Sequence, residues 1–568
     1  MAVLYQGFHR QWCAASLQTY VMVIFTSFTP IWSRQAAAVG LFFCCLVGCG
    51  ASFATADTTQ PASAPSQPSA EFGFDSVCQV AEQRLAIPFS RKVLDLPCEL
   101  IGLDYDSWRY IAYHVHKAIW RQAELPFQVE TGHRGYLFPQ RVDLHEVVDK
   151  HARELPFSPH SFEYRSWLRG YRFPRTLGHS GWKLLGKFND ELLAAEDSEQ
   201  DVFVREIASF LGASYFRVLG SQHVYGSSTR GLAVDGAMAH PEEFPVFTQF
   251  WLQQPDPQSR SFRCWALLES ERVIGAYQFD VTPDVTTVVS VRTKLYVRGK
   301  IEKLGIAPIT SMWMWGGGVA PPQGDPRREV HDADGLLVLG TDHSQLWRPL
   351  SRPSIPIVNH YAVPGLIAFG LVQRNRDPKF YGDNEARYHH RPSILIEPQP
   401  AWPAGGVELL RLPARHEGVD NIAAFYLLKE PPLQGESIEL EYRIHVCDDD
   451  KTTKLNENRS ADNSNHQVAR FIESHVTNPE PGVWKIRLTA DASETLLASL
   501  SEEKLQPDLI SLWNELGKIQ HRAVQRDSNE VTVSLEVHTD PGMAFELLLR
   551  LNDGQRDLTE MWSYRCEP

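Results

Sequence analysis

The feature that most constrains the fold of this chain is a succession of alternating apolar segments that begins near residue 125. Segments such as GAYQFDVTP at 275–283 and TTVVSVRTKLYVR at 286–298 are rich in β-branched and aromatic residues, and Gly, Pro and Asp separate them. This alternation predicts β-strands. No regular rhythm of strands and helices is present to supply crossover connections, so we expect a mostly antiparallel β-sandwich.

The segment 448–466 interrupts this pattern, because it is charged, rich in Asn and almost free of apolar residues. Such a composition is typical of a linker or long loop. Strand-like segments resume beyond it, and NDG at 552–554 predicts a hairpin turn. Residues 491–516 have a helical periodicity that Pro507 interrupts. We therefore expect a small second β-domain that carries a helical insertion.

The N-terminal residues have the composition of a targeting segment. The apolar run at 36–49 has the length of a signal-peptide core rather than of a membrane span. Two processing sites compete: an A-x-A type site at 54–56, and a lipoprotein box that would put a lipid on Cys49. Met22 is a plausible start of the natural chain. We therefore expect export, with residues 1–56 as the targeting segment.

A linker and a short helix follow the targeting segment. Residues 57–71 are rich in Ala, Ser, Thr, Pro and Gln without apolar periodicity, which is typical of a disordered linker. The next segment, DSVCQVAEQRLA at 75–86, repeats apolar residues at helical spacing behind Asp75 as an N-cap. One short helix is predicted there.

Cysteine content and charge limit the classes of function. The cysteines that remain after the targeting segment are Cys78, Cys98, Cys264, Cys447 and Cys566. Cys78 and Cys98 are the closest-spaced disulfide candidates, and an odd number leaves one thiol over. No CxxC pair remains for a zinc knuckle. A formal net charge of -14 argues against nucleic acid as a partner, since phosphate binding needs clustered Lys and Arg.

Several long motifs occur in an order that carries a family resemblance. They are LGASYFRVLGSQHVYGSSTRGLAVD at 211–235, EEFPVFTQFWL at 242–252, KLGIAPITSMW at 303–313, VHDADGL at 330–336, LWRPL at 346–350, GLVQRNRD at 370–377, YHHRPS at 388–393 and VDNIAAFY at 419–426. In their order and spacing the chain resembles the periplasmic glucan biosynthesis protein family, the G and D proteins of osmoregulated periplasmic glucan synthesis. The resemblance runs from about residue 72 to the end.

The resemblance implies a fold and a cellular role. The fold is a large N-terminal antiparallel β-sandwich of the galactose-mutarotase-like, carbohydrate-active type over 72–447. A smaller immunoglobulin-like β-sandwich over 467–568 follows it. The role is in making periplasmic glucans with a β-1,2-linked glucose backbone. Some members resemble inverting glycoside hydrolases of β-1,2-glucan, and a related member transfers the chain onto itself.

The resemblance also implies two catalytic carboxylates. An inverting glycosidase needs one carboxylic acid to protonate the leaving oxygen and one carboxylate to activate water. By resemblance Asp420, in the DNI motif, is the general acid and Asp332, directly after a histidine, is the general base. From the residues alone other interpretations stay open. Asp332 also suits a polar turn or, less well, a calcium loop, and Asp420 also suits an N-cap.

Further residues of the same motifs are candidates for contacts with sugar. Trp313 and Trp347 offer flat apolar faces, and Arg230 and Arg348 offer planar polar groups, although core packing is the more common role of tryptophans in a chain that has fifteen of them. His331 is a candidate to orient Asp332, and Asp334 is a turn or supporting residue. No cofactor and no metal are expected.

The segment FYGDNEARYHHRPS at 380–393 is polar, aromatic and basic, as functional loops are. The resemblance implies that this loop reaches the active site of the partner in a homodimer, with Tyr388 and Arg391 as substrate contacts. An ordinary surface loop is the alternative. For the whole protein, the alternative to catalysis is a glucan-binding protein that assists a membrane glucan synthase without changing the chain.

Overall fold

The structure is a computed structural model that describes residues 71–91, 95–198, 204–448, 468–493, 495–512 and 519–567. The predicted targeting segment with Cys49 and Met22, and almost all of the predicted linker at 448–466, lie outside the described residues. Within them, strands dominate and helices are few, which confirms the all-β prediction. No described helix is long and apolar enough to cross a membrane.

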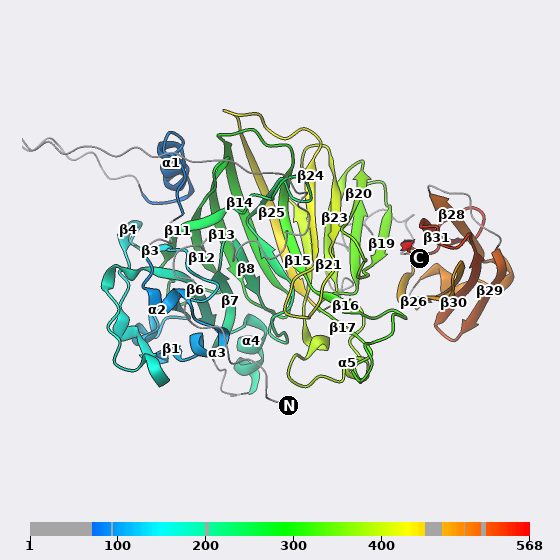
Figure 1. Ribbon diagram of the computed structural model, residues 1–568, viewed down its shortest axis with the longest axis horizontal. Coiled ribbons are helices and arrows are strands. Elements are labelled where there is room, and N and C mark those ends of the chain that lie inside the picture. The colour runs from blue at the N-terminus through cyan, green and yellow to red at the C-terminus, as the bar shows by residue number, and fades with distance from the viewer. Residues whose placement is uncertain are drawn as a thin grey trace, which may run out of the picture. The chain divides into compact units, whose positions relative to one another are not determined.

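The larger of two extended sheets has fourteen strands, several of which are labelled in Figure 1. In sheet order they are β28 (Gln506–Leu512), β31 (Phe545–Asn552), β32 (Met561–Cys566), β19 (Gln345–Pro349), β18 (Gly335–Gly340), β21 (Leu366–Val372), β22 (Ser393–Pro398), β25 (Ser437–Cys447), β14 (Thr287–Val297), β13 (Val273–Thr282), β12 (Phe262–Glu269), β11 (Val246–Gln253), β3 (Asp143–Val148) and β4 (His151–Glu154). Neighbours are antiparallel except β3 with β11 and β19 with β32.

The second extended sheet has ten strands. Its order is β2 (Phe127–His133), β6 (His179–Gly186), β7 (Arg205–Leu211), β8 (Tyr215–Val218), β9 (Ser228–Arg230), β15 (Leu304–Ser311), β24 (Ile422–Leu428), β23 (Gly405–Arg411) and β20 (Ile357–Val363), with β10 (Leu232–Val234) also on β15. Side chains of both sheets form one core. The ring of Trp182 in β6 lies 5.6 Å from that of Phe250 in β11, and Phe210 in β7 lies 5.3 Å from Phe279 in β13. The two sheets therefore form a sandwich.

The C-terminal strands form a second core. A four-stranded sheet has the order β26 (Arg470–Glu480), β27 (Val483–Asp491), β30 (Glu530–His538) and β29 (Ile519–Asp527). Its side chains pack with those of β28, β31 and β32, and Trp347 of β19 joins the same core. Because β32 pairs with β19, the large sheet continues into the C-terminal strands. The domain division at 447 and 467 stays a prediction.

The predicted helical insertion over 491–516 is wrong. The described residues there form two 3₁₀ turns, η8 (Leu496–Ser499) and η9 (Glu502–Lys504), followed by strand β28. Leucines of η8 cover the C-terminal core, which accounts for their helix-like spacing. Pro507 is tolerated because β28 lies at the edge of the sheet.

The predicted helix near 75–86 is confirmed as α1 (Phe74–Arg84), although Gly73 rather than Asp75 is its N-cap. Val77 and Ala81 of α1 pack against Trp265 and Ile274 of the large sheet. Cys78 is buried and Cys98 is exposed, and the two form no disulfide.

The remaining elements are short. They are α2 (Cys98–Ile101), α3 (Tyr105–Trp108), α4 (Asn189–Ser198), α5 (Pro378–Tyr381), the 3₁₀ turns η1 (Val115–Lys117), η2 (Arg121–Ala123), η3 (Pro159–Ser161), η4 (Ser166–Leu168), η5 (Arg175–Leu177) and η6 (Tyr388–His390), the strand pair β1 (Ile111–Tyr113) and β5 (Phe162–Tyr164), and the pair β16 (Trp313–Trp315) and β17 (Val330–His331). The β16–β17 pair directly follows β15 and leads into β18.

The low pKa values of two buried histidines predict that the protein loses stability in acid. Burial lowers the pKa of His133 and of His179 to about 4. An unfolded chain binds these protons below about pH 6.5, so stability falls as the pH drops from 6.5 towards 4. At pH 5 each of these histidines lowers the free energy of unfolding by about 2 kcal/mol. Thermal melts at pH 7 and pH 5 measure the loss. His179→Gln should reduce this loss of stability, whereas replacement of the exposed His116 should leave the loss unchanged. An equal loss in both variants would show that protonation of His179 is not its cause.

Candidate functional site

Four consecutive residues at the end of β15 hold both predicted catalytic aspartates. Met312 accepts a hydrogen bond at 2.8 Å from the backbone N–H of Asp332. Thr310 donates from its hydroxyl to Oδ2 of Asp420 at 3.3 Å. All eight residues of β15 are buried, so these anchors are fixed by the core. The fold thereby brings together two aspartates that are far apart in the sequence.

Asn421, which follows Asp420, strengthens this arrangement. Its Oδ1 accepts from the backbone N–H of Trp313 at 2.9 Å, and its Nδ2 donates to the carbonyl of Trp313 at 3.0 Å and to that of Leu412 at 3.1 Å. Its backbone N–H donates to Ser311 at 3.1 Å. Asn421 is only 1% exposed, so these bonds are shielded from water. The start of β24 is therefore tied to the residues that also hold Asp332.

The carboxylate of Asp332 is buried and ion-paired. It accepts a hydrogen bond from Nη1 of Arg391 and is only 4% exposed. Burial raises the pKa of Asp332, the charge of Arg391 opposes this effect, and the charge of Asp420 adds to it. Asp420, at the start of β24, is half-buried. The two carboxylates are therefore close enough to influence each other, and Asp332 has the environment of a proton acceptor.

Tyr388 and Arg391 contact this aspartate site within the same chain. The guanidinium of Arg391 stacks over the ring of Tyr388 at 4.2 Å, and the hydroxyl of Tyr388 donates to Glu417 at 2.9 Å. Burial raises the pKa of Tyr388 above its usual value. The loop at 380–393 thus lies between Asp332 and the segment that precedes Asp420.

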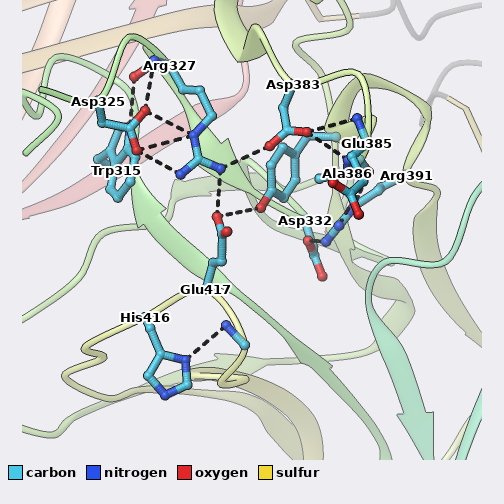
Figure 2. Close-up of polar contacts among 12 residues, drawn as sticks. Trp315, Asp325, Arg327, Asp332, Asp383, Glu385, Ala386, Arg391, His416 and Glu417 are labelled. Atoms are coloured by element: carbon cyan, nitrogen blue, oxygen red, sulfur yellow. Dashed lines mark hydrogen bonds and ion pairs between the residues drawn. The ribbon is translucent and has the colours of Figure 1, made fainter. Parts of the chain in front are cut away.

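Arg327 joins three loops around the site, as Figure 2 shows. It binds Asp325 through Nε and Nη2, and its Nη1 donates to Asp383 at 3.0 Å and to Glu417 at 2.8 Å. Its guanidinium also lies 5.6 Å from the centre of the Trp315 ring. The planar guanidinium has five donors, so it can bind Asp325 through two nitrogens and still reach Asp383 and Glu417. Sequence reasoning missed Arg327, Glu417 and Asn421, because their partners come from distant segments.

The predicted sugar-binding residues fall into two groups. Arg230 pairs with Glu242 at 2.6 Å, and the charge of Asp420 acts on it, so Arg230 lies near the aspartates. Trp313 is joined to Asn421 through its backbone. In contrast, Arg348 is fully buried and binds Glu546 and, at 2.8 Å, Ser563.

Trp347 belongs with Arg348 in the second group. It is 3% exposed, and the guanidinium of Arg374 lies 3.6 Å from the centre of its ring. It also contributes to the core that the C-terminal strands share with the large sheet. The contacts of Arg348 and Trp347 are therefore with that core and its surroundings rather than with either aspartate.

His331 takes another role than the one considered from the sequence, whereas Asp334 is a supporting residue, as considered there. The ring of His331 contacts Gln373 and Glu329 instead of Asp332. Oδ2 of Asp334 accepts backbone N–H bonds from Arg374 at 2.5 Å and Asn375 at 2.7 Å. Asp334 therefore supports the loop after β21, and Arg391 is the side chain that pairs with Asp332.

Fold and site together define a class of protein: a β-sandwich protein in which a buried and a half-buried aspartate share one anchoring segment. Comparison of the sequence with family models gives the particular family. Residues 72–566 match the family described as "Periplasmic glucan biosynthesis protein, MdoG". The chain belongs to this family, which confirms the resemblance stated from the motifs.

Curated relatives agree with the family model. The chain is 35% identical to Glucans biosynthesis protein G of Ralstonia nicotianae, over 89% of this chain and 98% of the relative. It is 36% identical to Glucans biosynthesis protein D 1 of the same organism, over 91% and 95%. Identity to Glucans biosynthesis protein G of Pectobacterium carotovorum is 32%, over 87% and 93%. Relatives named G and relatives named D thus match at similar levels.

Replacement of Asn421 by alanine tests the anchoring segment. The variant leaves the backbone groups of Trp313 and the carbonyl of Leu412 without a partner in a buried place. We expect a loss of about 3 kcal/mol in the free energy of unfolding, measured by urea denaturation. Asn189→Ala, which removes a single exposed hydrogen bond, should cost less than about 1 kcal/mol. Equal losses of unfolding free energy in the two variants would show that the buried hydrogen bonds of Asn421 stabilise the protein no more than one exposed hydrogen bond does.

Proposed function

We propose that the protein cleaves or transfers the β-1,2-linked backbone of periplasmic glucans by an inverting mechanism with two aspartates. The observation that supports this proposal best is the common anchoring of Asp332 and Asp420 by residues 310–313. A pair of carboxyl groups separated by room for a water molecule is what inverting glycosidases require. Family membership supports the glucan as the substrate class.

In the proposed reaction Asp420 is the general acid. Its proton passes to the glycosidic oxygen as the bond to the anomeric carbon breaks. Asp332 is the general base and receives, directly or through intervening hydroxyl groups, the proton of the attacking water or sugar hydroxyl. Arg391 keeps Asp332 ionised before the reaction, and burial makes the carboxylate a stronger base.

Tyr388, Arg391, Arg230 and Trp313 are the proposed binding residues beside this pair. Arg230 lies near Asp420, and Tyr388 is held against Arg391. Arg348 and Trp347 are better explained as packing residues. The proposed assembly is a homodimer, with a membrane glucan synthase as a further partner. Arg391 forms its ion pair with Asp332 of its own chain, so this ion pair does not require a partner subunit.

Incubation with linear β-1,2-glucan tests the proposal. Wild type should shorten or cyclise the chains, as chromatography of the products would show. Asp420→Asn and Asp332→Asn should each reduce the rate by about 100-fold or more, which is the usual contribution of a general acid or base. Asp280→Asn, which changes a half-buried aspartate of β13 that pairs with Arg263, is the matched control and should keep the wild-type rate.

Binding measurements separate catalysis from the carrier alternative. If wild type binds the glucan but neither shortens nor cyclises it, the protein is a glucan-binding protein and the catalytic proposal is wrong. If both aspartate variants bind the glucan as tightly as wild type and only turnover is lost, the aspartates act in the chemical step.

We also propose that the N-terminal signal exports the protein to the periplasm. The family description supports this location. Mass spectrometry of the protein purified from the cell envelope should show a chain that begins near Asp57, or a lipid on Cys49 if the lipoprotein box is used. A chain that retains residues 1–56 in the cytoplasm would contradict export.

A further inference from the structure

A second polar cluster lies on the segment that carries Asp332. It consists of Glu329, His331 and Asp334, and one oxygen or nitrogen atom from each lies within 4.8 Å of the other two. His331 is 1% exposed. Its Nε2 lies 3.3 Å from Oε2 of Glu329 and 3.5 Å from Oδ1 of Asp334. One ring nitrogen thus points at two carboxylates.

Gln373 determines which nitrogen of His331 carries the proton. Nε2 of Gln373 donates to the carbonyl of Tyr388 at 3.3 Å and to the hydroxyl of Tyr381 at 2.8 Å. A carbonyl only accepts, so the orientation of the Gln373 amide is fixed. Its Oε1 must therefore accept from Nδ1–H of His331 at 3.1 Å. In the neutral imidazole the Nε2 lone pair then faces two carboxylates, neither of which donates a proton when ionised.

The distances around Nε2 differ from those of the three other hydrogen-bonded histidine–carboxylate pairs among the described residues. His445 with Glu397, His223 with Asp448 and His538 with Glu536 lie at 2.9, 2.9 and 2.8 Å. These are normal charge-assisted hydrogen bonds. At 3.3 and 3.5 Å, the His331 contacts are longer. Two ligands bound to one zinc ion at tetrahedral angles lie about 3.4 Å apart, which agrees with the observed spacing.

The cluster borders a cavity and has partners that orient its ligands. The cavity has a volume of about 390 Å³ and is also lined by Trp313, Trp347 and His475. Asn375 donates to Glu329 at 2.7 Å, while backbone N–H groups hold Asp334. Such supporting bonds are typical of metal ligands. The cavity leaves room for a water molecule or a further ligand beside the cluster.

We propose that Glu329, His331 and Asp334 bind a divalent transition-metal ion of the zinc type. One imidazole nitrogen and two carboxylate oxygens suit zinc better than magnesium or calcium, which prefer oxygen ligands alone. This site replaces the metal-free expectation from the sequence. The bound ion would hold β17 to the start of β18 on either side of Asp332, and so keep the segment that carries this aspartate in place.

Titration of the full chain with Zn²⁺ tests the proposal. The protein is prepared without a polyhistidine tag, treated with a chelator and dialysed, and binding is measured by calorimetry. We expect one Zn²⁺ per chain in wild type. Glu329→Gln and Asp334→Asn should each weaken binding about 100-fold or more, since loss of a supporting group alone costs 10–100-fold. Glu397→Gln, which alters the ordinary pair with His445, should bind as wild type does.

Co²⁺ in place of Zn²⁺ gives a second measurement on wild type that does not depend on the folding of a variant. An intense visible absorption, typical of a four- or five-coordinate site, supports the proposal, whereas the weak absorption of hydrated Co²⁺ overturns it. Absence of Zn²⁺ binding in wild type, or unchanged binding in a folded Glu329→Gln protein, also overturns it and leaves a protonated His331 between two carboxylates. No glucan is present, so the result is independent of the proposed glucan reaction.

Discussion

The geometry of the aspartate site depends on the hydrogen bonds that residues 310–313 make as they leave β15. Their backbone groups and one hydroxyl serve both the segment of Asp332 and the segment of Asp420 and Asn421. Because β15 is buried along its whole length, these residues cannot shift without disturbing the core. The packed sandwich therefore fixes the positions of two carboxylates, one directly after the end of β17 and one just before β24.

Buried charge is the second constraint on this region, since an ion removed from water must be compensated. Arg391 compensates Asp332, and Arg327 compensates three carboxylates on separate loops. Each pair also fixes the position of a loop, so the same interactions that make the charges tolerable shape the site. Removal of Arg391 would leave the charge of Asp332 buried, which makes this pair sensitive to single substitutions.

The family relationship and the local chemistry support each other without being the same argument. The matching relatives carry names of glucan biosynthesis proteins of both the G and the D kind. The site adds a pair of interacting aspartates, one held by an arginine, beside an arginine–glutamate pair near Asp420. Behind the first aspartate the Glu329, His331 and Asp334 cluster adds a feature that the proposed glycosidase chemistry does not use.

The sequence by itself determined the all-β class, the helix near residue 75 and the family, because strand alternation and contiguous motifs are local properties of the chain. It misassigned 491–516, where leucines spaced like those of a helix cover a core from 3₁₀ turns. Only the tertiary structure decided that Arg391 rather than His331 pairs with Asp332, that Arg348 turns to Glu546, and that Asn421 ties Trp313 to Asp420. Those contacts join residues far apart in the sequence, and the register of paired strands rather than any local pattern sets which of them meet.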